Sequence, residues 1–333
     1  MEANGKPVYC QNSLIIHYLM CLLGISYQKA RIRNIVKDYD SYPKLSVKNL
    51  TDVLKRLGID SSAIKTKPET IKRIQTPFIV YFGNGEINKY FVVVKWIVEN
   101  KISYYSADEG EVIEDFKYFV EKWTGVVVLV SAENYDNSIK GENDYELELA
   151  KEYKQNNVKV IPNFLSEEEC KLLIEYTENL GGYSNSRIVG KTGEAIIDYT
   201  RTSHSVNLPS DALPLFAIIR NRVTNFLGVP ECYIEGLQCV RYSGGQHFAP
   251  HLDSNERLNR KHTMLVYLND EFTGGETYFP ELLLKILPVK GSALYFQNED
   301  NVGNSIPFSV HAGLRLKTGV KYACNIWVKD RIA

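Results

Sequence analysis

Three residues in the second half of the chain have the types and spacing of a metal site. His251 and Asp253 are two positions apart, and alternate residues of an extended strand point to the same side, so both side chains could reach one ion. His311 follows much later, where a distant strand of the same barrel could supply a third ligand. Two histidines and one carboxylate form the facial triad of Fe(II) oxygenases, which leaves positions open for substrate and oxygen. The pattern therefore predicts an Fe(II) site. The other histidines of this half are interpreted as ordinary polar residues: His204, His247 and His262.

A second candidate for chemistry is Cys10, which precedes an apolar segment with the character of a helix. A helix N-terminus lowers the pKa of a thiol, and cysteine nucleophiles are often presented in this way. Such a nucleophile needs a histidine to take its proton and a carboxylate to orient that histidine. The only histidine of the first half, His17, lies inside the same predicted helix and is not expected to face Cys10.

The first half predicts two helices followed by strands. The apolar segment 12–23 ends at Gly24, which suits a helix with a C-terminal glycine, and Ser46 can cap a second helix that stops at Gly58. After Pro77, short β-branched or aromatic runs alternate with turn residues, as in the strands of one sheet. These runs are residues 78–82, 90–97, 102–105 and 126–130.

A polar stretch over residues 133–155 marks the expected boundary between two cores, and its second half, from Tyr145, has helical character. We predict one domain over residues 1–133, a partly helical linker over 134–156 and a second domain over 157–333. A length of 333 residues supports two cores, because a single hydrophobic core seldom grows this large.

The second core is expected to be rich in strands. Ser166 begins a capping box that opens a helix, and from Ala195 onward only short strand-like runs with Gly, Pro and Asn turns are apparent. This rhythm predicts a β-sandwich or jelly roll. The expected strands include residues 238–242, 263–268, 293–296 and 322–328.

Composition excludes several classes of partner. The chain has 39 Lys and Arg against 40 Asp and Glu, so its net charge of -1 gives no general attraction to nucleic acid or to an anionic membrane. No apolar run approaches the length that crosses a bilayer. The six cysteines are scattered without metal-type spacing, which fits a reducing compartment. We therefore expect a cytoplasmic protein without a nucleic-acid or membrane partner.

The stretch RYSGGQHFAPHLD over residues 241–253 resembles the metal-binding strand of the prolyl 4-hydroxylase family of 2-oxoglutarate- and Fe(II)-dependent dioxygenases. Three later motifs agree in order, and the resemblance extends over about residues 157–330. They are residues 267–277, 311–313 and 319–327. The resemblance implies a double-stranded β-helix with flanking helices that binds Fe(II) through the three predicted ligands.

The same resemblance implies roles for further residues. Lys321 matches the basic residue that clamps the distal carboxylate of 2-oxoglutarate, a task that needs a cation deep in the barrel. Tyr242 and Tyr267 match positions whose hydroxyls can bond the cosubstrate, although Tyr267 equally suits the core. Arg201 and Arg260 match positions on the substrate side.

The reaction implied is hydroxylation coupled to oxidative decarboxylation. The cosubstrate chelates the iron, O2 binds at the free position, and succinate and carbon dioxide are released as a hydroxyl is returned to the substrate carbon. Fe(II), 2-oxoglutarate and O2 are thus the implied cofactor and cosubstrates, with ascorbate as an optional reductant. Phe248 stands where many members carry tyrosine, which leaves the identity of the substrate open.

The first half resembles the peptidase domain of bacteriocin exporters, a papain-like α+β fold, over about residues 5–132. In that family a histidine precedes the Phe-Val run, but Tyr90 stands there in this chain, and Gln11 replaces the glycine that follows the cysteine. Asp108 could fill the orienting position, yet it has no imidazole to orient. The resemblance therefore implies a peptidase fold without peptidase chemistry, in which Cys10 is a small side chain.

These observations lead to one main hypothesis and two alternatives. The main hypothesis is a hydroxylase of a peptide or protein side chain, with proline as the first guess, whose N-terminal domain binds the substrate or its leader. The alternatives are a noncatalytic protein in which both domains bind peptides, and a cysteine peptidase that uses Cys10. The hydroxylated residue, the stereochemistry and the oligomeric state stay open.

Overall fold

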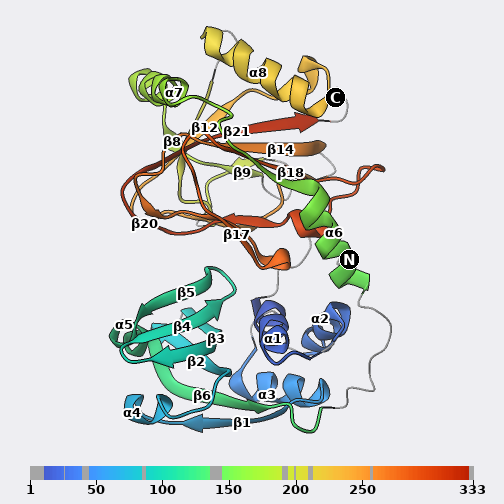
Figure 1. Ribbon diagram of the computed structural model, residues 1–333, viewed down its shortest axis with the longest axis vertical. Helices are drawn as coiled ribbons and strands as arrows, with labels where there is room; N and C mark the ends of the chain where they lie inside the picture. The colour runs from blue at the N-terminus through green and yellow to red at the C-terminus, as the bar shows by residue number, and fades with distance from the viewer. Residues whose placement is uncertain are drawn as a thin grey trace. The chain divides into compact units, whose positions relative to one another are not determined.

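The structure is a computed structural model that describes residues 11–25, 27–39, 45–84, 88–135, 145–189, 194–198, 200–208, 213–255 and 258–329. The chain divides into two compact units, and the division falls between Ala150 and Lys151 (Figure 1). It lies inside helix α6 (Tyr145–Asn157), within the segment predicted as a partly helical linker. The predicted domain limits at residues 133 and 157 stay predictions.

The N-terminal unit is built on a six-stranded antiparallel sheet with the order β1-β6-β2-β3-β4-β5. All four predicted strands are present, and β1 and β5 add one strand at each edge. Its strands are β1 (Asp60–Lys65), β2 (Phe78–Asn84), β3 (Asn88–Val98), β4 (Lys101–Ser106), β5 (Gly110–Asp115) and β6 (Trp123–Ser131). Its helices are α1 (Gln11–Leu22), α2 (Lys29–Lys37), α3 (Val47–Arg56), α4 (Pro68–Ile71) and α5 (Phe116–Lys122).

Local signals explain the two helices that the sequence predicts in this unit. Gly24 adopts a φ of +64° just after α1, a conformation that glycine reaches without the penalty paid by other residues. The side chain of Ser46 caps α3 by accepting a hydrogen bond from the backbone N–H of Asn49 (3.1 Å). Helix α3 then buries Leu50 and Leu54 on one face.

The C-terminal unit is a sandwich of two main sheets. The larger has seven strands in the order β7-β18-β14-β21-β12-β11-β8, and the smaller has four in the order β13-β19-β16-β17. Two-stranded pairs, β15 with β20 and β9 with β10, complete the unit. The larger sheet contains β7 (Val158–Ile161), β8 (Ser184–Asn185), β11 (His204–Asn207), β12 (Gln238–Tyr242), β14 (Arg260–Tyr267), β18 (Ala293–Gln297) and β21 (Lys321–Lys329). The remaining strands are β9 (Ile188–Val189), β10 (Ala195–Ile196), β13 (Phe248–His251), β15 (Thr273–Gly274), β16 (Thr277–Phe279), β17 (Leu284–Ile286), β19 (His311–Gly313) and β20 (Leu316–Thr318).

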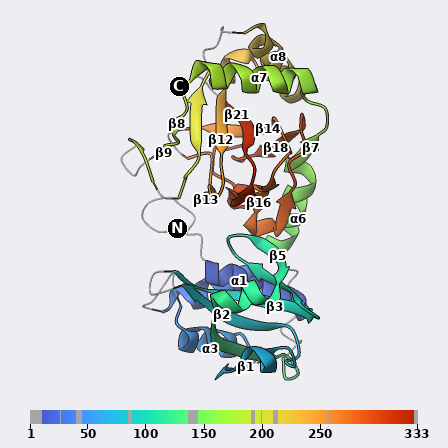
Figure 2. The same cartoon turned by 90° about the vertical axis from the view of Figure 1, so that its left-hand side faces the viewer.

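Alternation along β14 separates the two faces of the larger sheet. Met264 and Val266 belong to the core cluster beneath the helices α7 (Glu167–Leu180) and α8 (Pro214–Leu227), whereas Leu265 and Tyr267 belong to the cluster between the sheets. Figures 1 and 2 show both helices on the same face of this sheet. The opposite, inner face is therefore where polar side chains of β14 and β21 can form a site.

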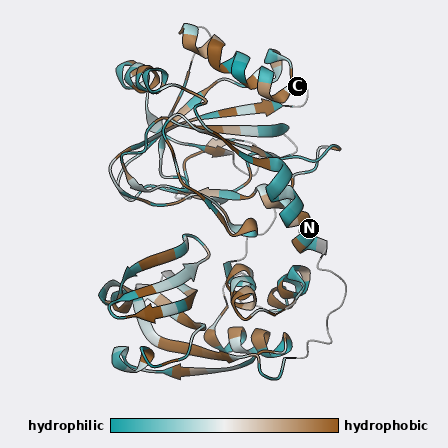
Figure 3. Ribbon diagram, viewed as in Figure 1, coloured by the Kyte–Doolittle hydropathy of each residue, from teal (hydrophilic) through white to brown (hydrophobic). Residues whose placement is uncertain are grey.

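Helix α8 corrects the expectation that only short strands follow Ala195. It is a 14-residue helix with a proline in its first turn and Gly228 in the left-handed conformation after its end. Phe216, Ile219 and Val223 are buried at helical spacing, and Figure 3 shows hydrophobic and hydrophilic stretches alternating along it. The helical spacing of these buried residues, with the proline at the start and the glycine after the end, accounts for a helix here.

The capping box predicted at Ser166 is confirmed, because Ser166 and Glu169 exchange side-chain and backbone hydrogen bonds at the start of α7. Within the described ranges, no helix is long and apolar enough to cross a membrane. The cytoplasmic location stays a prediction.

Candidate active site

The two predicted histidine ligands face each other across a pair of strands. His251 ends β13, His311 begins β19, and these two residues are direct partners in the antiparallel pairing. Their ring centroids are 4.3 Å apart. Strand β13 stops at His251, so Asp253 lies in the bend just beyond it rather than on the strand. Its carboxylate still reaches the histidines, because Oδ1 is 3.5 Å from His251 Nε2 and Oδ2 is 3.7 Å from His311 Nε2.

Backbone carbonyls fix the tautomer of both imidazoles. His251 Nδ1 is 2.9 Å from the carbonyl of Ala249, and His311 Nδ1 is 3.0 Å from the carbonyl of Ser309. A carbonyl only accepts, so each Nδ1 carries the proton and donates it. In this tautomer Nε2, the nitrogen nearer to Asp253, is the atom that can coordinate a metal ion, and the backbone carbonyl orients the ring as in metal-binding histidines.

Burial keeps the site in the protonation state that suits a cation. Burial, reinforced by the neighbouring His251, lowers the pKa of His311 to about 4, so this ring is neutral at pH 7. Burial alone would raise the pKa of Asp253, but the two histidines and the Arg260 guanidinium outweigh it and hold this pKa below its usual range. The neutral imidazole of His311 and the ionised carboxylate of Asp253 are therefore available together, beside the imidazole of His251.

The residues present fit Fe(II). Among the described residues, these three form the cluster of His, Cys, Asp and Glu side chains that could hold a metal ion, with their ligand atoms within 4.8 Å of one another. The other histidines of this half are engaged elsewhere: His204 with Gln246, His247 with Thr202 and His262 with Tyr295. Two nitrogens and one oxygen, with no thiolate, match the donor set of the facial triad.

A buried lysine lies on the inner face near this cluster. Lys321 begins β21 opposite Tyr242 of β12, and its Nζ donates to the carbonyl of Gly275 (2.6 Å). The ammonium is 5.3 Å from the ring centre of Tyr242 and 5.4 Å from that of Tyr267, so the two predicted tyrosines flank it. Burial lowers the pKa of Lys321 to about 8, partly offset by the charge of Glu276.

The hydroxyls of both tyrosines already have polar neighbours. Tyr267 OH is 2.8 Å from Thr277 Oγ1, and the hydroxyl of Tyr242 interacts with Ser203. Burial raises the pKa of both tyrosines, so they stay protonated across the physiological range. They are able to donate hydrogen bonds to a carboxylate held by Lys321.

Two adjacent glycines precede the backbone carbonyl that binds Lys321, and the second of them leaves space for its side chain. Gly274 has a φ of +75°, and a Cβ there would lie 2.4 Å from the carbonyl oxygen of Arg315. Gly275 has a φ of +70°, and a Cβ there would lie 3.2 Å from the Lys321 side chain. Only glycine combines this conformation with so little room, which accounts physically for the Gly-Gly pair in the sequence motif.

Arg201, which the sequence predicts on the substrate side, packs beside the candidate metal ligands. It forms a bridge with Phe248, and its guanidinium is 4.7 Å from the centre of that ring, which in turn stacks on His251 at 3.5 Å. The guanidinium donates to the carbonyl of Arg187 and to Gln238 (both 2.9 Å). Phe248 therefore connects Arg201 to the metal ligands through packing.

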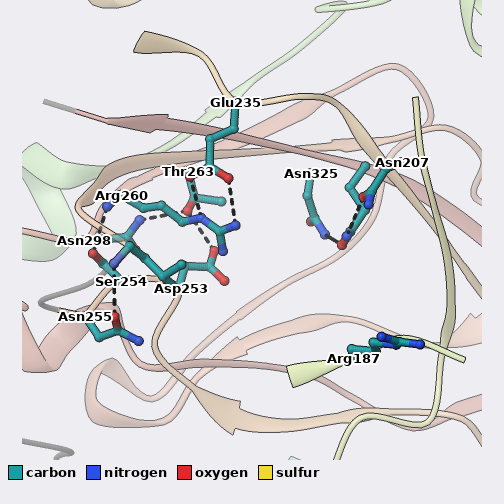
Figure 4. Close-up of polar contacts among 12 residues, drawn as sticks. Arg187, Asn207, Glu235, Asp253, Ser254, Asn255, Arg260, Thr263, Asn298 and Asn325 are labelled. Atoms are coloured by element: carbon teal, nitrogen blue, oxygen red, sulfur yellow. Dashed lines mark hydrogen bonds and ion pairs between the residues drawn. The ribbon is translucent and has the colours of Figure 1, made fainter. Parts of the chain in front are cut away.

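Arg260 has a partner that the sequence did not indicate. Its guanidinium makes two hydrogen bonds to Glu235 (2.9 and 2.8 Å; Figure 4). It also lies 3.7 Å from the ring centre of Trp327. Glu235 is distant in sequence and belongs to no motif, so only the fold reveals the pair. Thr263, which donates to Asp253, and Asn298, which donates to Thr263, were missed for the same reason.

The N-terminal unit lacks a described histidine at the predicted peptidase site. Cys10 lies outside the described residues, while its neighbour Gln11 donates to both oxygens of Asp108 (2.7 and 2.6 Å). Tyr90, where the family has histidine, packs edge-on against Phe82. His17 instead contacts Tyr27 and Cys21, and burial, aided by nearby positive charges, holds its pKa well below the usual value.

Comparison with known proteins agrees with the division of the chain into two units. Residues 237–329 match the 2OG-Fe(II) oxygenase superfamily, and residues 14–135 match the Peptidase C39 family. The "Putative prolyl 4-hydroxylase" of Acanthamoeba polyphaga mimivirus is 31% identical over 185 residues, which is 52% of this chain and 74% of that protein. Prolyl 4-hydroxylase 1 of Arabidopsis thaliana is 31% identical over 194 residues, 52% of this chain and 68% of that protein.

A solved viral collagen prolyl hydroxylase from Paramecium Bursaria Chlorella virus-1, in complex with 2-oxoglutarate, is 27% identical with a TM-score of 0.44, covering 53% of this chain and 97% of that one. The alignments cover 74% and 68% of these two relatives at 31% identity. The chain therefore belongs to the prolyl 4-hydroxylase family of 2-oxoglutarate- and Fe(II)-dependent oxygenases, with a Peptidase C39-type domain preceding the oxygenase domain.

Proposed function

We propose that the chain hydroxylates proline residues of a peptide or protein, using Fe(II), 2-oxoglutarate and O2. The observation that carries this proposal is the convergence of two imidazoles and one carboxylate on the inner face that also holds the buried Lys321. A bound Fe(II) with 2-oxoglutarate supplies the oxidising chemistry. Proline is proposed because the relatives that the chain matches are named prolyl 4-hydroxylases.

In this proposal each residue has a distinct task. His251, Asp253 and His311 hold the metal, and Lys321 pairs with the distal carboxylate of 2-oxoglutarate in a pocket where its charge is poorly solvated. Tyr242 and Tyr267, which flank that ammonium, orient the same cosubstrate by hydrogen bonds.

On the substrate side, we propose that Arg201 and Arg260 contact the peptide. Arg201 is held rigidly over Phe248, and the charge of Arg260 is already balanced by Glu235. A balanced, stacked guanidinium suits an uncharged peptide backbone better than an acidic side chain, since Glu235 would oppose a second carboxylate. Neutral proline-containing peptides are therefore the first substrates to test.

The proposal is tested by aerobic incubation of the full chain with Fe(II), 2-oxoglutarate and proline-containing peptides. Mass spectrometry should find one added oxygen on proline, with one succinate released for each oxygen added. Omission of 2-oxoglutarate is the control. Succinate release without peptide oxidation across a broad peptide set would reject proline peptides as substrates while leaving the oxygenase chemistry intact.

We propose that the N-terminal unit binds the substrate or its leader without cleaving it. Gln11 occupies both oxygens of Asp108, and aromatic packing holds Tyr90 at the position of the family histidine. A domain with this fold would keep a surface for extended peptides while lacking the base that a cysteine nucleophile needs.

The first prediction concerns the peptidase alternative. Cys10→Ala should leave both peptide hydroxylation and peptide integrity unchanged, because no described histidine is placed to make a thiolate at neutral pH. Hydroxylation is followed by succinate release and cleavage by mass spectrometry of the same peptide. Cleavage by the wild type that disappears in the variant would restore the cysteine peptidase.

A second prediction concerns tethering of the substrate. A chain of residues 134–333 retains helix α6, whose Tyr153 hydroxyl donates to the carbonyl of Gln297 (2.5 Å), and so keeps the packing of the oxygenase unit. Without the N-terminal unit, KM for a verified substrate should rise roughly tenfold or more, since a tethered binding site raises the effective concentration of peptide. Turnover of 2-oxoglutarate without peptide is the internal control and should persist. Equal kcat/KM in the two chains would show that the N-terminal unit does not recruit that substrate.

A further inference from the structure

We infer that Thr263 and Asn298 are positioning residues that make Asp253 offer a single carboxylate oxygen to the metal. The inference deepens the proposed function and rests on it. Thr263 Oγ1 lies 2.8 Å from Asp253 Oδ2, and Asn298 Nδ2 lies 2.8 Å from Thr263 Oγ1, so the three side chains form a line (Figure 4). All three are buried, with exposed fractions of 8%, 1% and 0% from Asp253 to Asn298.

The direction of the hydrogen bonds in this line follows from the chemistry of its members. An ionised carboxylate only accepts, and a threonine hydroxyl has a single proton. If the amide oxygen of Asn298 faced Thr263, two acceptors would compete for that proton. With Nδ2 facing Thr263, as the structure has it, the amide donates to the hydroxyl and the hydroxyl donates to Asp253 Oδ2. Every bond of the line is then satisfied.

The backbone holds Asn298 in place for this task. Its N–H donates to the carbonyl of Lys261 on β14 (2.7 Å), and its own carbonyl accepts from Ile306 (2.8 Å). Asn298 Oδ1 has no hydrogen-bond partner among the described residues, so Thr263 is the contact that sets the direction of the amide. Thr263 in turn occupies the inner face of β14, on the side of Leu265 and Tyr267.

This chain of hydrogen bonds matters because the position of the Asp253 carboxylate does not by itself determine which of its two oxygens binds the metal. Oδ1 is 3.5 Å from His251 Nε2 and Oδ2 is 3.7 Å from His311 Nε2, so both oxygens are close to ligand nitrogens. Only Oδ2 accepts the Thr263 hydroxyl, which leaves Oδ1 as the better donor to a cation. With one atom from each ligand, an octahedral ion keeps three positions open, whereas a carboxylate bound through both oxygens would leave two. Three open positions are needed for a chelating cosubstrate and oxygen together.

The experiment uses the full chain and Co(II), whose visible spectrum changes with the number and geometry of its ligands. Thr263→Val removes the hydroxyl while keeping the shape of the side chain. We expect an altered Co(II) spectrum and a rise in the Kd of 2-oxoglutarate, of about the 10- to 100-fold size by which lost outer-shell partners lower metal affinity or activity. Thr263→Ser restores the hydroxyl and should return both readouts to within about threefold of wild type. Thr177→Val is the matched control, because it removes another buried threonine hydroxyl, on α7, and should change neither.

Asn298→Ala provides a second route if Thr263→Val folds poorly, as judged by its melting temperature. It frees the Thr263 hydroxyl to rotate and should change both readouts in the same direction by a smaller factor. Unchanged spectrum and 2-oxoglutarate affinity in either folded variant would overturn the inference. A different result would overturn the selection of one oxygen. In it, Thr263→Val lowers Co(II) affinity tenfold and Thr263→Ser restores it, but the Co(II) spectrum does not change. Failure of the wild type to bind Co(II) or 2-oxoglutarate would instead reject the proposed function.

Discussion

Replacing His311 or His251 by alanine should abolish metal binding and succinate production. Each variant removes one of three protein ligands, and both nitrogens are preset for coordination by the carbonyls that hold their Nδ1 protons. Loss of an outer-shell partner alone typically costs 10- to 100-fold in metal affinity, so loss of a ligand should weaken Fe(II) affinity by more than about 100-fold. The measurement is anaerobic titration with Fe(II), together with succinate release in air.

His204→Ala is the matched control for the two ligand variants. His204 is a half-buried histidine of the same unit that contacts Gln246 rather than the metal cluster. It should keep the Fe(II) affinity and turnover of the wild type. Full activity in His311→Ala would show that the site has been assigned to the wrong residues.

The second large effect is expected at Lys321, in both affinity and pH dependence. Lys321→Ala should raise the Kd of 2-oxoglutarate about 10- to 150-fold, the equivalent of about 1.5–3 kcal/mol for a lost hydrogen bond to a charged group. Binding of Fe(II) should persist, because Lys321 is not among the metal ligands. Lys317→Ala is the control, since it removes an exposed lysine from the neighbouring strand β20.

The pH dependence follows from the lowered pKa of Lys321. Burial lowers this pKa to about 8, so the ammonium is present below pH 8 and is lost as pH rises through that value. Affinity for 2-oxoglutarate should therefore fall above about pH 8, by up to about tenfold per pH unit. Tyr242 and Tyr267 do not contribute to this loss of affinity at high pH, because burial raises the pKa of each.

Lys321→Arg separates this explanation from a general loss of structure at high pH. A guanidinium stays charged throughout the range, so the variant should bind 2-oxoglutarate with little change between pH 7.5 and pH 9.5, even if its affinity is lower overall. Calorimetric titration across this range gives both curves. A parallel decline in wild type and Lys321→Arg would mean that Lys321 does not control the pH dependence.

Much of the candidate site could be predicted because its residues lie close in sequence to one another or to characteristic turn residues. His251 and Asp253 are two residues apart, and Lys321 comes directly after the turn that ends in Gly319 and Val320. The same holds for Ser166 and Gly24, whose local backbone requirements mark the limits of helices α7 and α1. Such features depend on a few neighbouring residues and survive in the sequence as patterns.

The parts that were missed depend on contacts between distant segments. Thr263 looks like any β-branched strand residue, and only the pairing of β14 with its neighbours places it on the inner face beside Asp253. Glu235 and Arg260 are 25 residues apart in the sequence, and no periodic pattern indicates that their side chains make contact. Helix α8 was missed for a different reason, since its many β-branched and aromatic residues favour strand in isolation, while burial of one face decides for helix.

The contacts of the ligands with both sheets have a consequence for the amount of protein that a cell maintains. His251 and His311 belong to the smaller sheet, whereas Asp253 is bonded to Thr263 on the larger one, so an ion at this site links the two layers of the sandwich. An ion that binds only the folded chain adds to its stability by mass action, by about 2.7 kcal/mol when free metal is 100 times the Kd. Under iron starvation that contribution disappears, and the chain unfolds more often and is exposed to proteases. Iron supply would then set the abundance of the enzyme as well as its turnover.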